Sequence, residues 1–309
     1  MRAVKAVDGT ARVVDQPWPR GEGVTVRVAS AGVCGSDLHL LGWKIPVVLG
    51  HEMAGSLPDG TPVVVEPMDP CWTCDACLSG AYNLCPRGPS MVLGVGRDGG
   101  MADACVVPPT SLISLPAGVD LADACLVEPL AVAVHAVRRG RVSAGQRVAV
   151  VGGGSLGQLS VVAAQACGAE VSLEARHQAQ IEVGRQLGAH AVTDGYDVVI
   201  DAAGTSSALA RAVELCRPGA AVLAVGTYWD TPALPALDMG TREISLVPCS
   251  MYGREGPVRD FDAAAAMLAG RPELPRLIIT HRFPLDAAGE AFDAARDRAS
   301  GAIKVVLEP

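Results

Sequence analysis

Four cysteines in one short stretch constrain this chain of 309 residues more than any other feature. They stand at Cys71, Cys74, Cys77 and Cys85, a C-x2-C-x2-C-x7-C pattern. Neither helical nor strand periodicity calls for thiols at this spacing, whereas a loop around a tetrahedral zinc must bring four sulfur atoms to about 2.3 Å from the metal. Disulfides across gaps of two residues would be strained. The pattern therefore predicts a structural zinc site, closed by four thiolates, that shapes a loop and performs no chemistry.

The composition excludes several classes of protein. Hydrophobic residues make up 50% and charged residues 19% of the chain, enough for two domains with buried cores. The net charge of −8 offers no basic surface for nucleic acid. The N-terminal residues lack a signal-peptide pattern, and ten cysteines in a reducing compartment suit metal binding better than disulfides. We therefore expect a cytoplasmic protein.

A stretch without charges at 148–169 is long enough to span a membrane. Its glycines at 152–154 and 157 and its two glutamines indicate a strand, a glycine turn and a buried helix instead. We therefore expect no membrane partner.

The residue pattern changes along the chain from β-rich to alternating. Val24, Val26 and Val28 alternate with polar residues, which predicts a half-buried strand, and further short apolar runs follow at 63–65 and 106–107. A helical pattern at 126–137 then leads into strands at 147–151, 171–173, 197–200 and 221–225, with helices at 156–167, 180–187 and 207–216. Such alternation predicts a parallel, doubly wound sheet. The tail has a helix at 287–296 and a strand at 303–307.

A glycine turn directly follows the predicted strand at 147–151. The residues Gly152-Gly153-Gly154-Ser155-Leu156-Gly157 match G-x-G-x-x-G and open a helix. In that context Gly152 allows a tight turn, Gly154 lets the backbone approach a pyrophosphate, and Gly157 lets the helix pack on the strand. The helix N-terminus then meets the phosphate charge. The turn predicts a dinucleotide-binding site, for which we take Gly152, Gly154, Ser155, Leu156 and Gly157.

The end of the next strand indicates which dinucleotide is bound. An acid at this point holds the ribose 2′-hydroxyl of NAD. Glu174 is one candidate, but counting back from the following helix puts Ala175 in the position of the acid, followed by Arg176 and His177. A missing carboxylate followed by basic groups suits a 2′-phosphate. The sequence therefore favours NADP over NAD, with Glu174, Arg176 and His177 as the residues near the ribose.

A second set of metal-binding residues precedes the four-cysteine run. A catalytic zinc takes three protein ligands and keeps one position open. Cys34 and His51 supply two ligands, and the third is a carboxylate from Glu128 or Glu52. Glu128 interrupts an apolar stretch, where an unpaired carboxylate would be costly and a metal would explain it.

These segments occur in one order that resembles the zinc-dependent medium-chain alcohol dehydrogenases, and most closely the polyol (sorbitol), threonine and glucose dehydrogenase branch. The resemblance rests on Cys34-Gly-Ser-Asp-Leu-His39, Gly50-His51-Glu52, the four-cysteine run, Glu128-Pro129-Leu130 and the glycine turn, and it covers essentially the whole chain. Two loops that flank the predicted site, after Glu52 and between His39 and Gly50, are shorter than in the family. The substrate preferences of the family therefore cannot be transferred.

The resemblance implies an α/β chain with a GroES-like, β-rich catalytic domain at 1–128 and 272–309 and a Rossmann domain at 129–271. It implies two zinc ions per chain, both in the catalytic domain. By position Cys34, His51 and Glu128 become the ligands of the catalytic zinc, and Glu52 becomes an adjacent or exchangeable ligand. A homodimer or homotetramer is expected.

The chemistry that these parts imply is zinc-assisted transfer of a hydride between a secondary alcohol, of polyol, sugar or cyclitol type, and the nicotinamide. The resemblance suggests that Ser36 takes the alcohol proton and that His39 delivers it to solvent. Two other functions use fewer of these residues. A zinc-free quinone or enoyl reductase would lack the second ligand set, and a redox sensor that binds a dinucleotide would keep the four-thiol site alone.

Overall fold

The computed structural model describes residues 1–43 and 45–309 and divides the chain into two compact units. Unit 1 comprises Met1–Glu128 and Tyr252–Pro309, and unit 2 comprises Pro129–Met251. The chain thus returns to unit 1 at residue 252, whereas the resemblance implies a return at 272. The reason is that the Tyr82 hydroxyl donates to the Gly253 carbonyl over 3.1 Å and Arg259 donates to Glu66 over 2.9 Å.

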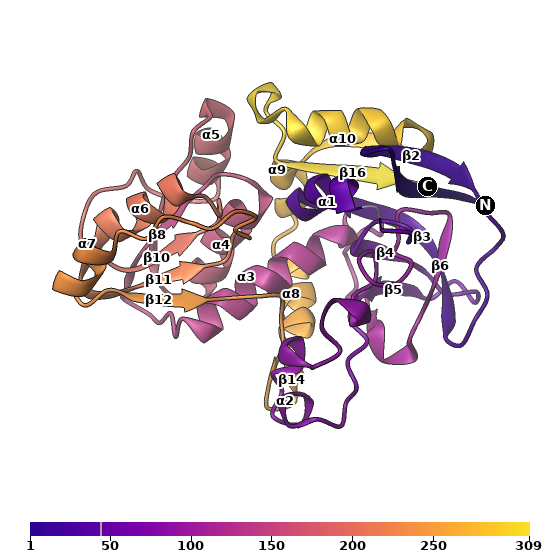
Figure 1. Cartoon of the computed structure of the whole chain (residues 1–309), viewed down its shortest axis with the longest axis horizontal. Coiled ribbons are helices and arrows are strands. Elements are labelled where there is room, and N and C mark those ends of the chain that lie inside the picture. Colours follow the sequence, from indigo (N-terminus) through magenta and orange to yellow (C-terminus); the bar gives the residue numbers. More distant parts are fainter. Residues whose placement is uncertain (44) are drawn as a thin grey trace. The chain divides into compact units, whose positions relative to one another are not determined.

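Unit 1 is built on a mainly antiparallel sheet of seven strands in the order β15-β16-β3-β4-β5-β7, with β6 paired to β3 (Figure 1). The strands of this sheet are β3 (Val24–Val33), β4 (Glu52–Ser56), β5 (Pro62–Val65), β6 (Ala104–Val107), β7 (Leu112–Ser114), β15 (Ile279–Pro284) and β16 (Lys304–Glu308). Two antiparallel pairs lie outside it: β1 (Arg2–Val7) with β2 (Thr10–Asp15), and β13 (Arg254–Glu255) with β14 (Val258–Arg259). The predicted β-rich first third is confirmed.

Short helices complete unit 1. They are α1 (Gly35–Leu40), α2 (Asp75–Leu78), α8 (Asp260–Ala269), α9 (Leu274–Ile278) and α10 (Ala288–Arg296), with 3-10 turns η1 (Leu41–Trp43), η2 (Tyr82–Leu84), η3 (Gly88–Met91), η4 (Pro109–Ser111), η5 (Ala124–Leu126), η6 (Leu285–Ala287) and η7 (Arg298–Ser300). One apolar cluster forms the core, because alternate residues of the central strands, including Val26, Val28 and Met53, pack together with Phe292 of α10.

The register of three strands in unit 1 brings distant residues to one edge of the sheet. Gly32 of β3 pairs with Glu52 of β4, and Val33 of β3 pairs with Val305 of β16. The residues just beyond these pairs therefore meet at the same place, although they come from three separate parts of the chain.

Unit 2 is a five-stranded parallel sheet in the order β12-β11-β10-β8-β9 (Figure 1). Its strands are β8 (Arg147–Val151), β9 (Glu170–Glu174), β10 (Tyr196–Asp201), β11 (Cys216–Ala224) and β12 (Ser245–Pro248), and its helices are α3 (Val127–Arg139, which begins in unit 1), α4 (Ser155–Ala166), α5 (Gln178–Gln186), α6 (Ser206–Leu215) and α7 (Ala236–Thr241). The chain runs from β8 to β9 on one side and then to β10 on the other. This reversal at the carboxyl end of β8 is where open α/β sheets bind their ligands.

The elements predicted for unit 2 are confirmed, with shifts of a few residues at most of their ends. The uncharged stretch at 148–169 forms β8, the glycine turn and α4, as expected. In the described part of the chain, no helix combines the length and the apolar character that a membrane crossing requires.

Candidate functional site

The four cysteines of the C-x2-C-x2-C-x7-C run converge in the loop between β5 and β6. Their sulfur atoms all lie within 4.8 Å of one another, and the Cys74 and Cys71 sulfurs lie 3.5 and 3.9 Å from that of Cys77. Zinc–sulfur bonds of about 2.3 Å in a tetrahedron place the sulfurs about 3.8 Å apart. All four are free thiols. The cluster therefore fits a zinc ion held by Cys71, Cys74, Cys77 and Cys85.

The protonation of this cluster differs from thiol to thiol. Donors from Thr73 and the backbone N–H of Cys74 lower the pKa of Cys71 to about 5, whereas burial raises the pKa of Cys77 to about 12. A thiolate is the form that binds metal. Cys71 is thus ready as a ligand, while Cys77 needs the positive charge of the ion to lose its proton.

A second cluster lies at the sheet edge where β3, β4 and β16 meet. Cys34 follows the end of β3, and His51 and Glu52 stand at the start of β4. Ligand atoms of these three residues lie within 4.8 Å of one another. The pairing of Gly32 with Glu52 produces this proximity, since it sets the residues that follow one strand beside those that begin the other.

A buried aspartate orients the histidine of the second cluster. Asp37 is fully buried, and its carboxylate accepts a hydrogen bond from the Cys34 backbone N–H over 2.9 Å. The other carboxylate oxygen lies 3.5 Å from Nδ1 of His51. The His51 ring thus turns Nε2 away from Asp37 and toward Ser36, whose Oγ lies 3.4 Å from it. The contact between Asp37 and Nδ1 is an ion pair without a hydrogen bond. A histidine with a carboxylate beside one nitrogen and the other nitrogen available is typical of metal ligands.

Glu52 is held by a lysine from the other end of the chain. The Lys304 ammonium donates to both Glu52 oxygens over 2.7 and 2.6 Å and to the Val33 carbonyl over 3.2 Å. Both side chains are 1% exposed. Gly32 makes room for this pair, because a Cβ there would lie 1.9 Å from a Glu52 oxygen.

Glu128 lies in the first turn of α3, buried, and hydrogen bonded to Tyr252. Burial raises the pKa of Glu128 to about 7, against the effect of the nearby His51. Burial alone would lower the pKa of His51, but the charges of Asp37, Cys34 and Glu128 raise it well above its ordinary value. The cluster holds more acidic groups than cations, which fits a divalent metal with Cys34, His51 and a carboxylate as ligands.

The three motif glycines of unit 2 each behave as the motif requires. Gly152 has a φ of +112°, which favours glycine, and a Cβ at Gly157 would lie 1.8 Å from the Gly152 carbonyl oxygen. Gly154, in contrast, has an ordinary φ of −70°, and a Cβ there would meet nothing within 4 Å. The open space at the start of α4, next to Ser155 and Leu156, fits the diphosphate of a dinucleotide.

The residues at the end of β9 and just after it lie in two different environments. The Glu174 carboxylate is engaged by the Arg211 guanidinium of α6, with contacts of 2.9 to 3.1 Å. Ala175 lies against the glycine turn, because a Cβ at Gly153 would come within 2.5 Å of it. Arg176 is exposed, and His177 is the residue before α5. The Glu174 carbonyl accepts from the Gly152 N–H over 2.9 Å, so the backbone of Glu174 and the side chain of Ala175 both lie beside the turn, while the Glu174 carboxylate faces Arg211.

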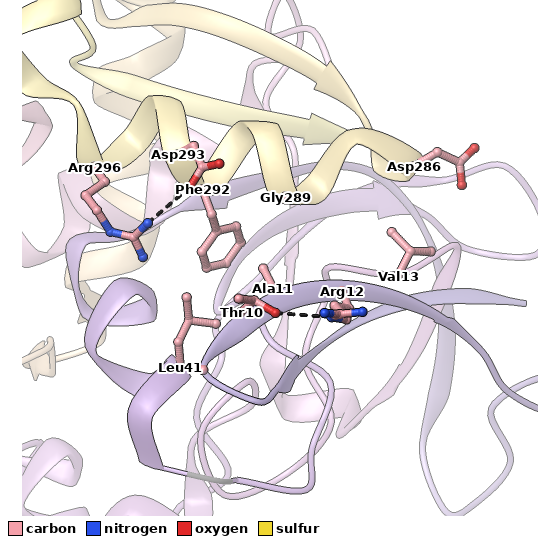
Figure 2. Close-up of a pocket in the computed structure, with 11 residues that line it drawn as sticks. Thr10, Ala11, Arg12, Val13, Leu41, Asp286, Gly289, Phe292, Asp293 and Arg296 are labelled. Carbon is pink, nitrogen blue, oxygen red and sulfur yellow. Dashed lines mark hydrogen bonds and ion pairs between the residues drawn. The ribbon is translucent and has the colours of Figure 1, made fainter.

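A separate cavity of about 580 Å³ lies between β2 and α10 (Figure 2). Its charged side chains already have partners: Arg296 donates to Asp293 over 3.1 Å, and Arg12 donates to Thr10 over 3.2 Å. None of the residues that line it belongs to the four-cysteine cluster or to the cluster of Cys34, His51 and Glu52. The cavity is therefore not the candidate catalytic site.

A parallel sheet with a dinucleotide turn, together with a cysteine–histidine–carboxylate cluster, defines a nicotinamide-dependent oxidoreductase. Residues 20–117 match the family model of the alcohol dehydrogenase GroES-like domain, and residues 155–270 match that of the zinc-binding dehydrogenases. The chain belongs to the zinc-binding dehydrogenase family and is an enzyme of the alcohol dehydrogenase class. The resemblance in the sequence is thereby confirmed.

Individual relatives cover nearly the whole chain. L-galactonate-5-dehydrogenase of Escherichia coli (strain K12) is 30% identical, over 90% of this chain and 89% of the relative. Sorbitol dehydrogenase of Bombyx mori is 30% identical, over 92% and 90%. A Sinorhizobium meliloti 1021 protein solved bound to NADP superimposes with a TM-score of 0.86 at 28% identity, over 100% of this chain and 99% of that one.

Three residues of these sites carry no signal in the sequence motifs. Asp37, Lys304 and Arg211 act through contacts with residues 14, 252 and 37 positions away, respectively, as the pairs with His51, Glu52 and Glu174 show.

Proposed function

We propose that this enzyme transfers a hydride between a secondary alcohol of polyol, sugar or cyclitol type and NADP, with one catalytic and one structural zinc ion per chain. The observation that carries the proposal is the Cys34–His51–Glu52 cluster, whose ligand atoms lie within 4.8 Å. The relatives named for L-galactonate and sorbitol support a polyhydroxylated substrate. We place the enzyme in the cytoplasm, as a homodimer or homotetramer.

The residues of the second cluster have separate tasks in this mechanism. Cys34 and His51 would hold the catalytic zinc together with a carboxylate from Glu52 or Glu128, and Asp37 fixes the orientation of the His51 ring. When bound, the zinc lowers the pKa of the substrate hydroxyl and the nicotinamide accepts the hydride. Lys304 donates to both oxygens of Glu52, so each of these two buried side chains has a partner of opposite charge.

The alcohol proton needs a route to water. Ser36 is partly buried, close to Nε2 of His51, and its hydroxyl can accept the proton while it passes its own onward. His39 lies three residues further along α1 and is exposed, so it can deliver the proton to solvent.

A substrate panel tests the function directly. Purified enzyme is given L-galactonate, sorbitol, other polyols and simple secondary alcohols with NADP or NAD, and formation of the reduced nicotinamide is followed by its absorbance. We expect oxidation of at least one polyol, which is lost in Cys34→Ala. Activity restricted to quinones or enoyl compounds and independent of zinc would contradict the proposal.

The preference for NADP depends on Arg176. At the end of β9 the Glu174 carboxylate is engaged by Arg211 and Ala175 stands at the turn. This strand end therefore offers a ribose 2′-hydroxyl no unpaired carboxylate, and Arg176 can bind a 2′-phosphate. We expect Arg176→Ala to weaken NADP binding about tenfold while NAD binding stays within about twofold. Fluorescence titration with NADPH and NADH measures both. An equal effect on the two cofactors, or none, would make the preference for NADP wrong.

A further inference from the structure

The guanidinium of Arg298 lacks an acidic partner. Arg298 opens the turn η7 after α10 and is partly buried. Across residues 1–43 and 45–309, no carboxylate forms an ion pair with it, and its hydrogen bond to the Ile303 carbonyl is long, at 3.5 Å. A guanidinium has five N–H donors, so most of the donors of Arg298 remain available to a ligand.

Other partly buried arginines in this structure have more ion-pair or hydrogen-bond partners. Arg2, Arg211 and Arg259 each pair with at least one aspartate or glutamate. Arg147 and Arg242, which form no ion pair among the described residues, each donate to two backbone carbonyls instead. A buried charge without a partner is costly, and a fold that keeps one commonly uses it to bind a ligand. Arg298 is therefore the arginine to examine for an anion.

Arg298 lies beside the cluster of Cys34, His51 and Glu52. A Cβ added to Gly35 would lie 3.9 Å from Nη2 of Arg298, and Gly35 directly follows Cys34. Gly35 is exposed, so the chain next to this nitrogen is in contact with solvent.

We propose that Arg298 binds the anionic group of the substrate, and that the substrate class is a polyol or sugar chain that carries a carboxylate or a phosphate. The inference rests on the proposed function and narrows it. A carboxylate or phosphate matches the planar, two-pronged donor geometry of a guanidinium. The relatives named for L-galactonate and for sorbitol are equally similar to the chain, so overall similarity favours neither an acid nor a neutral polyol. The unpaired guanidinium favours the acid.

The test compares Arg298→Gln with Arg296→Gln, which removes a charge two residues away that Asp293 already pairs. Kinetic constants are measured for L-galactonate, galactitol 1-phosphate and sorbitol. Calorimetric titration of L-galactonate into protein saturated with NADPH adds a measurement that requires no turnover, since NADPH cannot accept a hydride. Circular dichroism and NADPH titration establish that each variant is folded.

We expect Arg298→Gln to raise KM for both anions, and the calorimetric dissociation constant for L-galactonate, about 10- to 100-fold. Sorbitol should change by less than about twofold, and Arg296→Gln should change nothing. An equal rise of KM for sorbitol overturns the proposal. A loss of affinity confined to NADPH also overturns it, because the diphosphate of the cofactor would then be the anion that Arg298 binds. If wild-type enzyme prefers sorbitol, the substrate class is wrong while the proposed function stands. If it oxidises no alcohol, the proposed function fails and the calorimetric comparison alone decides the role of Arg298.

Discussion

At the scale of single residues, we expect Asp37 to determine how His51 binds a metal. Its carboxylate is fixed by the Cys34 N–H on one side and faces Nδ1 of His51 on the other. Removing the negative charge would free the ring to rotate and make His51 a weaker base. Loss of this charge should therefore weaken binding of a metal at the second site before it lowers the stability of the fold.

We expect Asp37→Asn to lower the affinity of the second site for zinc about 10- to 100-fold, since partners of metal-binding histidines typically have effects of this size. Competition with a chromophoric chelator measures the affinity of each site. The matched control is Asp201→Asn, which alters an equally buried aspartate in unit 2. Unchanged zinc affinity in Asp37→Asn would show that Asp37 does not orient a metal ligand.

The residues that a motif contains could be predicted from the sequence, whereas those that join motifs could not. Cys34 and His51 are recognisable because few other roles suit such residues just before a four-cysteine run. Lys304 is different, since it stands 252 positions from Glu52 and only the pairing of β16 with β3 brings the two together. Arg298 gave no signal at all, because what distinguishes it is the lack of a partner in the fold.

At the scale of elements, the turn between β8 and α4 separates glycines needed for folding from a glycine needed for a ligand. Gly157 has no room for a methyl group, because the Gly152 carbonyl would lie 1.8 Å away. Gly154 has both an ordinary backbone conformation and open space, so the fold alone would accept a side chain. A glycine that the fold does not require points to the approach of a ligand.

We therefore expect Gly154→Val to weaken NADPH binding at least about tenfold, while its free energy of unfolding stays within about 1 kcal/mol of wild type. Gly157→Ala should lower the free energy of unfolding by about 1–3 kcal/mol or more, because the added methyl overpacks the turn. Urea denaturation and NADPH fluorescence titration give both quantities. A large loss of stability in Gly154→Val would mean that the space at Gly154 is structural.

Most elements could be predicted from the periodicity of apolar residues, and the exceptions have tertiary causes. The segment 252–271 belongs to unit 1 because of Tyr82 and Glu66, and no local pattern reports such partners. Next to β9, His190 forms only an isolated bridge with Ser172. The sheet of unit 2 therefore ends at β9.

At the scale of the whole molecule, the two ends of the chain combine to build unit 1. β16, the last strand, lies between β15 and β3 in the sheet and delivers Lys304 to Glu52. Both metal clusters belong to unit 1, and the dinucleotide turn belongs to unit 2. The proposed metal sites and the proposed cofactor site thus lie in separate units, and each can be altered by itself.

The central claim is that unit 1 holds two zinc ions in two independent sites. Zinc content per chain, measured by mass spectrometry of the purified protein, tests it in wild type, in Cys34→Ala and in Cys105→Ala, a buried cysteine outside both clusters. The account predicts about two zinc ions in wild type and Cys105→Ala and about one in Cys34→Ala. A single zinc ion that survives Cys34→Ala would contradict it, because only the four-cysteine site would then bind metal and the chain would be a zinc-free reductase or a redox sensor.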